Sequence, residues 1–212
     1  MKIASAVFDL DGTLMKSDAT IYKCTQHTLR HFNITGEMPE EEFNNKIGYH
    51  FKDIFEGFNI SVPDLENFIA KYKTFYFDFI DESRVFPNVL DTLEYLNKKG
   101  IKVSLLTTKA QDQAEKILAH FGMSEYFEQI VGRRPEMKIK PAPDALLYIC
   151  EKTGVSADNT LMVGDSELDI RCGKNAGAHT CAVTFGYRKL SDLMSENPDI
   201  IINDMKELTK YI

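Results

Sequence analysis

Short runs of apolar residues recur along the chain, separated by segments in which apolar positions repeat with a helical period. The runs lie at residues 2–9, 101–107, 129–132, 160–165, 179–186 and 198–204. They do not alternate apolar with polar positions, which is expected of strands buried on both faces of a parallel sheet. The pattern predicts five or six such strands, with 129–132 the weakest.

Helical patterns lie between these runs from about residue 86 onward. The segment 89–99 places its apolar residues on one side, and the segment 111–122 ends in glycine. The segment 143–154 opens with proline and ends with glycine, the usual asymmetry of a helix. Strands that alternate with helices in this way predict an α/β fold with a doubly wound, mostly parallel sheet.

One region departs from this alternation. Between residues 15 and 83 there is no convincing buried strand, but there are helical patterns rich in Phe and Tyr at 19–34, 39–48 and 63–80. The sequence therefore predicts an α/β core built from residues 1–14 and 84–212. Residues 15–83 are expected to form a helical insertion after the first strand.

Composition narrows the functional classes. Of the 212 residues, 43% are hydrophobic and 27% are charged, which is typical of a globular protein with a real core. A net charge of −7 argues against general nucleic-acid binding. No apolar run approaches the ~20 residues of a membrane span, and the first residues do not resemble a signal peptide. The four cysteines form no CxxC pair, so reduced thiols in a cytoplasmic protein are expected.

Polar side chains that could take part in catalysis or ligand binding follow several of the predicted strands. In open α/β sheets, ligands bind beyond the carboxyl ends of the strands, so residues from distant segments are expected to converge there. The residues concerned are Asp9, Asp11, Thr107, Thr108, Lys140, Asp165 and Asp169. Each has an ordinary structural interpretation alone, such as a helix cap or a solvated charge. Their combination favours a functional site.

The combination suits the hydrolysis of a phosphate ester. Asp9, Asp11 and Asp165 supply the hard oxygen ligands that Mg²⁺ prefers. A calcium loop of the EF-hand type does not fit, because it places its glycine at position six and not four. Asp9 and Asp11 project to the same side of an extended segment, so one can attack phosphorus while the other acts as acid and base. Lys140 and the Thr107 hydroxyl can then hold the phosphoryl oxygens.

Four segments together resemble the motifs of the haloacid dehalogenase-like superfamily of phosphohydrolases. FDLDGTL (8–14) matches the first motif, LLTTK (105–109) the second, KPAPD (140–144) the third and GDSELD (164–169) the fourth. They occur in the family's order over nearly the whole chain, which makes the resemblance specific.

The resemblance implies a role for each matching residue. Asp9 corresponds to the nucleophile and Asp11 to the general acid/base. Thr107 binds the transferring phosphoryl group, with Thr108 beside it, and Lys140 neutralises that group. Mg²⁺ is bound by the side chains of Asp9 and Asp165 and by the backbone carbonyl of Asp11. Asp169 supports the metal waters or orients Lys140.

The insertion resembles the helical cap of the phosphoglycolate phosphatase and β-phosphoglucomutase branch of that superfamily. Lys16 stands where relatives usually carry an acidic residue, and Asn88 where they carry glycine, although asparagine tolerates a left-handed backbone. The implied activity is a Mg²⁺-dependent phosphatase acting on a small phosphate ester. We expect a monomer or homodimer without nucleic-acid or membrane partners. A phosphosugar mutase and a catalytically idle binding relative are the alternatives.

Two further pairs of residues have competing interpretations. Arg133 and Arg134 either contact a substrate carboxylate or lie in a solvated loop, and the loop is favoured. His27 and His31 lie one helical turn apart without acidic or cysteine neighbours, so an exposed helix face is favoured over a metal pair.

Overall fold

The structure is a computed structural model that describes residues 2–212. The chain divides into two compact units, one that runs up to Met15 and resumes at Val85–Ile212, and one formed by Lys16–Arg84. All of the residues singled out at the strand ends belong to the first unit, which we call the core unit. No helix among residues 2–212 has the length and apolar character needed to cross a bilayer.

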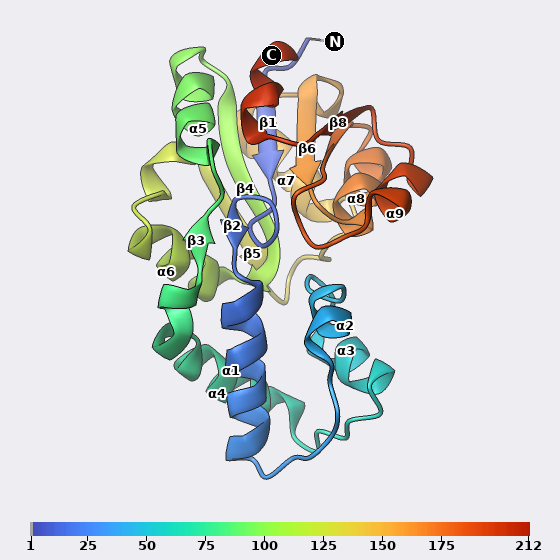
Figure 1. The fold of residues 1–212 in the computed structure, drawn as a ribbon. Helices are drawn as coiled ribbons and strands as arrows, with labels where there is room; N and C mark the ends of the chain where they lie inside the picture. Colours follow the sequence, from blue (N-terminus) through green and yellow to red (C-terminus); the bar gives the residue numbers. More distant parts are fainter. Residues whose placement is uncertain (1) are drawn as a thin grey trace. The chain divides into compact units, whose positions relative to one another are not determined.

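A six-stranded parallel sheet forms the centre of the core unit (Figure 1). Its strand order is β5-β4-β1-β6-β7-β8, so the first strand of the chain lies in the middle. The strands are β1 (Ser5–Phe8), β4 (Lys102–Ala110), β5 (Gln129–Arg133), β6 (Thr160–Gly164), β7 (His179–Val183) and β8 (Ile200–Ile202). The predicted doubly wound parallel sheet is confirmed. β4 runs three residues beyond the predicted end, because its pairing with β5 resumes at Ala110, opposite Arg133.

Helices connect the strands and cover the sheet. They are α5 (Val89–Lys98), α6 (Gln111–His120), α7 (Asp144–Thr153), α8 (Glu167–Ala176) and α9 (Leu190–Ser195), with 3₁₀ turns at Ser124–Tyr126, Ala157–Asn159 and Met205–Lys210. Val7, Leu106 and Met162 from three strands pack in one buried cluster with Leu146 and Ile149 of α7. A side chain facing this cluster alternates with one facing the opposite side of the sheet, so both faces are apolar.

The register of the sheet aligns the strand ends that carry polar residues. Phe8 lies opposite Leu105 of β4 and opposite Val163 of β6. Asp9 therefore follows β1 at the level where β6 ends, and Asp165 follows one residue later. This alignment of parallel strands places both aspartates at one edge of the sheet.

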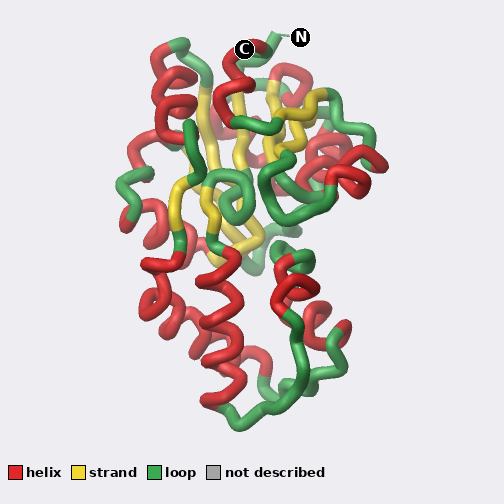
Figure 2. The backbone as a smooth tube through the Cα atoms, in the orientation of Figure 1, coloured by secondary structure: helices red, strands yellow, loops and turns green. Residues whose placement is uncertain are grey.

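The second unit is helical, as the loop-and-helix colouring of Figure 2 shows. It contains α1 (Asp18–His31), α2 (Glu40–Asn44), α3 (Phe51–Gly57), α4 (Leu65–Phe75) and the 3₁₀ segment Tyr76–Glu82. Aromatic rings fill its interior: Phe55 and Phe68 are buried and meet edge to face, with ring centroids 5.1 Å apart. His27 and His31 are exposed and pack edge-on against the Phe75 ring, as expected for a helix face.

Two very short strands mark where the chain passes between the units. β2 (Met15–Lys16) and β3 (Arg84–Val85) pair with each other in a separate two-stranded sheet. These strands were not predicted, since two residues carry no readable periodicity. Asn88, which follows β3, adopts a left-handed backbone with φ of 62°, and its amide donates to both carboxylate oxygens of Asp204 at 2.9 Å. The tolerance expected of asparagine at this position is confirmed.

Candidate active site

Asp9 lies at the end of β1 with its side chain almost entirely buried. Its backbone N–H continues the sheet by donating to the carbonyl of Val163 at 3.0 Å. The Lys140 ammonium donates to Asp9 Oδ1 at 2.7 Å, and only 3% of the Lys140 side chain is exposed. The carboxylate is therefore fixed by strand pairing at its backbone and by an ion pair at its side chain.

Lys140 is itself held by a second carboxylate. It donates to Asp169 Oδ1 at 2.5 Å, and the other oxygen of Asp169 accepts from the hydroxyl and the backbone N–H of Ser166. Ser166 and Asp169 thereby form a capping box at the start of α8. The start of α8 thus fixes the Asp169 carboxylate, and this carboxylate in turn holds the Lys140 ammonium. The arrangement favours the orienting role for Asp169 over the role in holding metal waters.

Asp165 completes a buried cluster of carboxylates. One of its oxygens accepts from the Tyr187 backbone N–H at 2.8 Å and the other from the Thr13 hydroxyl at 3.4 Å. Gly12, with φ of +87°, passes so close that a Cβ there would collide with the Asp165 carboxylate. Only glycine combines this left-handed turn with the close approach, which explains the glycine that follows Asp11.

The cluster carries an excess of negative charge. Oxygens of Asp9, Asp165 and Asp169 all lie within 4.8 Å of one another. Against the single Lys140 ammonium, three carboxylates leave a formal charge of −2 when all four groups are ionised. Burial raises the pKa of Asp9 well above its usual range and the pKa of Asp165 to about 7. Burial alone would lower the pKa of Lys140, but Asp169 and Asp9 raise it above its ordinary value, so we regard the lysine as charged.

This donor set fits a divalent cation. A doubly charged ion would balance the formal charge of the cluster, and carboxylate oxygens are the ligands that Mg²⁺ prefers. Two of the three predicted metal ligands, Asp9 and Asp165, belong to the cluster. The third, the backbone carbonyl of Asp11, stays a prediction.

Asp11 is paired with a residue that the sequence analysis did not single out. Lys109 Nζ lies 3.1 Å from Asp11 Oδ2, and the two side chains are 8% and 12% exposed. The Asp11 carboxylate is thus engaged by a lysine from β4 and does not belong to the three clustered carboxylates. Lys109 directly follows the LLTT segment, and its position at a strand end was the available signal.

The two threonines at the end of β4 differ in how far they are buried. Thr107 is buried, and its Oγ1 accepts from the backbone N–H of Lys109 at 3.2 Å. Thr108 is partly buried. Roles for both in binding phosphoryl oxygens stay predictions.

A second ion pair borders the site. Arg188 Nε donates to Glu167 Oε2 at 3.0 Å, and both side chains are largely buried. Arg188 also lowers the pKa of Asp165, against the larger effect of burial. The sequence pointed to the FGY segment that ends at Tyr187, but it did not identify Arg188.

Comparison with known proteins identifies the family. The model of the family described as haloacid dehalogenase-like hydrolase matches residues 6–183. The chain is 33% identical to pyrophosphatase PpaX of Bacillus pumilus, over 99% of this chain and 96% of that one. It is 30% identical to phosphoglycolate phosphatase of Haemophilus influenzae, over 97% and 96%. A solved structure described as a predicted phosphatase from Clostridium acetobutylicum is 27% identical, with a TM-score of 0.87 over 100% and 98% of the two chains. The chain belongs to the haloacid dehalogenase-like hydrolase family, and the prediction of a phosphoric ester hydrolase is confirmed.

Proposed function

We propose that the protein is a Mg²⁺-dependent phosphatase that hydrolyses a small phosphorylated metabolite through an aspartyl-phosphate on Asp9. The observation that carries the proposal is the buried Asp9–Lys140–Asp169 arrangement beside Asp165, whose formal charge is −2 when all four groups are ionised. A structural ion-pair cluster would be expected to balance its charge within the chain. This one is deficient by the charge of one divalent ion.

In the first half of the reaction, an Asp9 carboxylate oxygen attacks phosphorus and the bond from phosphorus to the leaving oxygen breaks. Asp11 donates a proton to that leaving oxygen. Lys140 lies 2.7 Å from Asp9, where its charge offsets the charge of the transferring phosphoryl group. Asp9, Asp165 and the Asp11 carbonyl would hold Mg²⁺, and the bound ion would supply further charge stabilisation at the phosphoryl oxygens.

In the second half, water attacks the phosphorus of the aspartyl-phosphate. Asp11 accepts a proton from this water, the bond from phosphorus to Asp9 breaks, and inorganic phosphate leaves. Asp11 thereby returns to the protonated form required for the next cycle. The same groups serve both halves, which is why two aspartates two residues apart suffice.

The names of the relatives support a small anionic substrate, and they favour two candidates. Phosphoglycolate phosphatase names a phosphate ester, and pyrophosphatase PpaX names a phosphoanhydride. Attack by Asp9 on phosphorus is the same step in both cases, so pyrophosphate hydrolysis is the second candidate function. We further propose a cytoplasmic enzyme, a monomer or homodimer, in which the unit Lys16–Arg84 serves as the cap that governs specificity.

Phosphate release from a panel of small phosphates tests the proposal. The panel contains 2-phosphoglycolate, pyrophosphate, hexose phosphates and nucleoside monophosphates, assayed with Mg²⁺ and after its removal by a chelator. We expect turnover with Mg²⁺, its loss on chelation and its return when Mg²⁺ is added back. An isomerised hexose phosphate without released phosphate would establish the mutase instead, and an absence of any turnover would favour the idle relative.

Replacing Lys109 by methionine is expected to lower kcat about tenfold to a hundredfold, because the Asp11 carboxylate loses the ammonium that holds it. KM should change little, since neither Lys109 nor the Asp11 carboxylate belongs to the cluster of three carboxylates. Lys109→Arg should recover part of the rate. Steady-state kinetics on the preferred substrate measure this effect, with Lys116→Met, at an exposed position of α6, as the matched control. A raised KM with unchanged kcat would show that Lys109 binds the substrate instead of positioning Asp11.

A further inference from the structure

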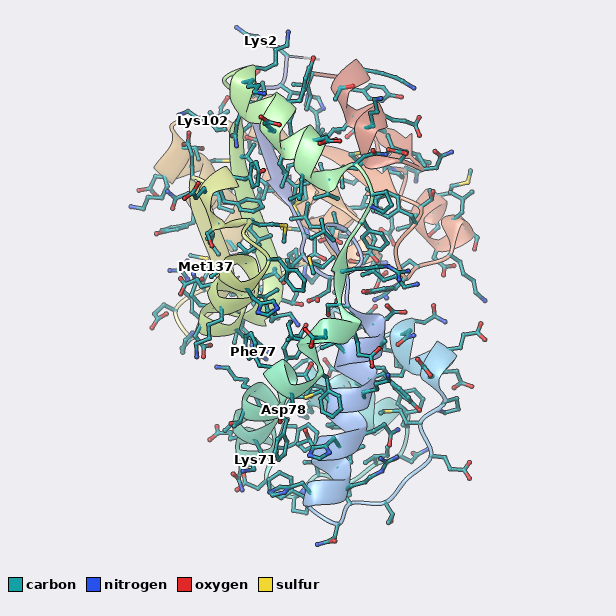
Figure 3. The ribbon with its side chains drawn as sticks, turned by 60° about the vertical axis from the view of Figure 1, so that its left-hand side comes forward. Lys2, Lys71, Phe77, Asp78, Lys102 and Met137 are labelled. Atoms are coloured by element: carbon teal, nitrogen blue, oxygen red, sulfur yellow. The ribbon has the colours of Figure 1, made fainter. Side chains whose placement is uncertain are left out.

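A cavity of about 890 Å³ lies beside the catalytic lysine, within the core unit. It is bordered by the end of β5 and by the loop that leads from β5 to α7. Four cations, Arg133, Arg134, Lys138 and Lys140, contribute to its walls, together with apolar side chains such as Met137 and Ile139. Met137, which belongs to this loop, is labelled in Figure 3.

The charge of this segment is unusual for the chain. The protein carries a net charge of −7, yet residues 133–140 contain four cations and one acidic residue. Lys140 is paired with carboxylates. Within residues 2–212, Arg133, Arg134 and Lys138 form no ion pair with a carboxylate. The cavity therefore presents positive charge that the described chain does not neutralise.

Arg133 and Arg134 do not lie in a solvated loop, which was the interpretation favoured from the sequence. Both are partly buried. Burial lowers the pKa of Arg133, and no neighbouring carboxylate raises it again. Arg134 stacks on the Tyr148 ring at 5.3 Å, and its Nε is buried with no hydrogen-bond partner among the described residues. A buried donor without a partner is costly, and a ligand oxygen would satisfy it.

We propose that this cavity binds a second anionic group of the substrate, so that the enzyme selects phosphates bearing a carboxylate or a further phosphate. The guanidinium fork matches both groups, because it can donate two parallel hydrogen bonds to either. Lys140 is the residue that the two places share, because it belongs to the cavity wall and its ammonium contacts Asp9. The apolar part of the wall accommodates the carbon skeleton between the two anionic groups. This inference rests on the proposed phosphatase function.

Substrate discrimination by an Arg134→Gln variant tests the inference. The two substrates are 2-phosphoglycolate and ethyl phosphate, which has the same chain length but no carboxylate. We expect the wild type to prefer 2-phosphoglycolate. In the variant, the ratio of the two kcat/KM values should fall about tenfold or more, mainly through a higher KM for 2-phosphoglycolate. Arg133→Gln should lower the ratio in the same direction, and thermal melting checks that both variants fold.

Lys152 offers a matched control. Its ammonium also lies 5.3 Å from the Tyr148 ring, but Lys152 does not line the cavity. Lys152→Gln should therefore leave the substrate ratio as it is. An unchanged ratio in both folded arginine variants, or an equal loss on both substrates, would overturn the inference. A wild type that releases phosphate from ethyl phosphate but shows no preference would overturn it while leaving the phosphatase function standing. A wild type inactive on the whole panel would overturn the proposed function itself.

Discussion

Replacing Asp9 by asparagine is expected to abolish phosphate release, by a factor on the order of 10⁴ to 10⁶, which is the scale observed when an enzyme loses its nucleophile. The amide has nearly the same shape as the carboxylate but cannot attack phosphorus. It also removes one negative charge from a buried cluster with a formal charge of −2, so the fold should not suffer. Steady-state turnover and thermal melting of the same preparation measure the two effects separately.

Two comparisons make this result specific. Asp158→Asn makes the same substitution at an exposed position of the core unit and should retain full turnover. Mass spectrometry of acid-quenched wild type should detect covalent phosphate during turnover, and none should appear on the Asp9→Asn protein. Turnover of the variant within tenfold of the wild type would show that Asp9 is not the nucleophile.

Replacing Lys140 by methionine is expected to damage both activity and stability. The change leaves Asp9 and Asp169 buried without the ammonium they share, and breaking a buried pair in this way costs about 3–5 kcal/mol. For a chain of this size, the loss lowers Tm by roughly 6–20 °C. Phosphate release should fall by at least about 10³-fold, because the transferring group loses a fixed cation.

The matched control is Lys98→Met, which breaks the ion pair with Glu94 at 2.6 Å on the exposed face of α5. Such a surface pair contributes at most about 1 kcal/mol, so Tm and turnover should stay near wild type. Raising the Mg²⁺ concentration should restore part of the Tm of Lys140→Met but little of its turnover. Equal melting temperatures for the two lysine variants would mean that the Lys140 ammonium does not stabilise the buried carboxylates as expected.

The strands of the core unit were predictable because a strand buried on both faces consists of a continuous run of apolar residues. The run at residues 160–165 is an example, because strand β6 covers residues 160–164 of it. β4 was underestimated, because its last residues are polar and stay in the sheet through pairing with β5. β2 and β3 depend on each other across some seventy residues, a pairing that no local pattern encodes.

The candidate site was predictable to the extent that strand ends determine it. Asp9, Asp165 and Lys140 converge because the sheet aligns the ends of β1 and β6, and because the loop before α7 returns to the same edge. The pairing of Lys109 with Asp11 was not predictable, since it depends on how far a long side chain reaches. The burial of Arg134 depends on stacking against Tyr148, which lies fourteen residues away in another element.

The central position of β1 has a consequence for synthesis of the chain. β1 is made first, but its two neighbours in the sheet are residues 102–105 and 160–163. At a typical elongation rate, the second neighbour leaves the ribosome on the order of ten to thirty seconds after the first strand. During that interval the apolar side chains of Ala6, Val7 and Phe8 cannot yet be buried in their sheet. We expect nascent chains of this enzyme to keep a chaperone bound to the β1 segment until residues 160–163 have been translated and can pair with it.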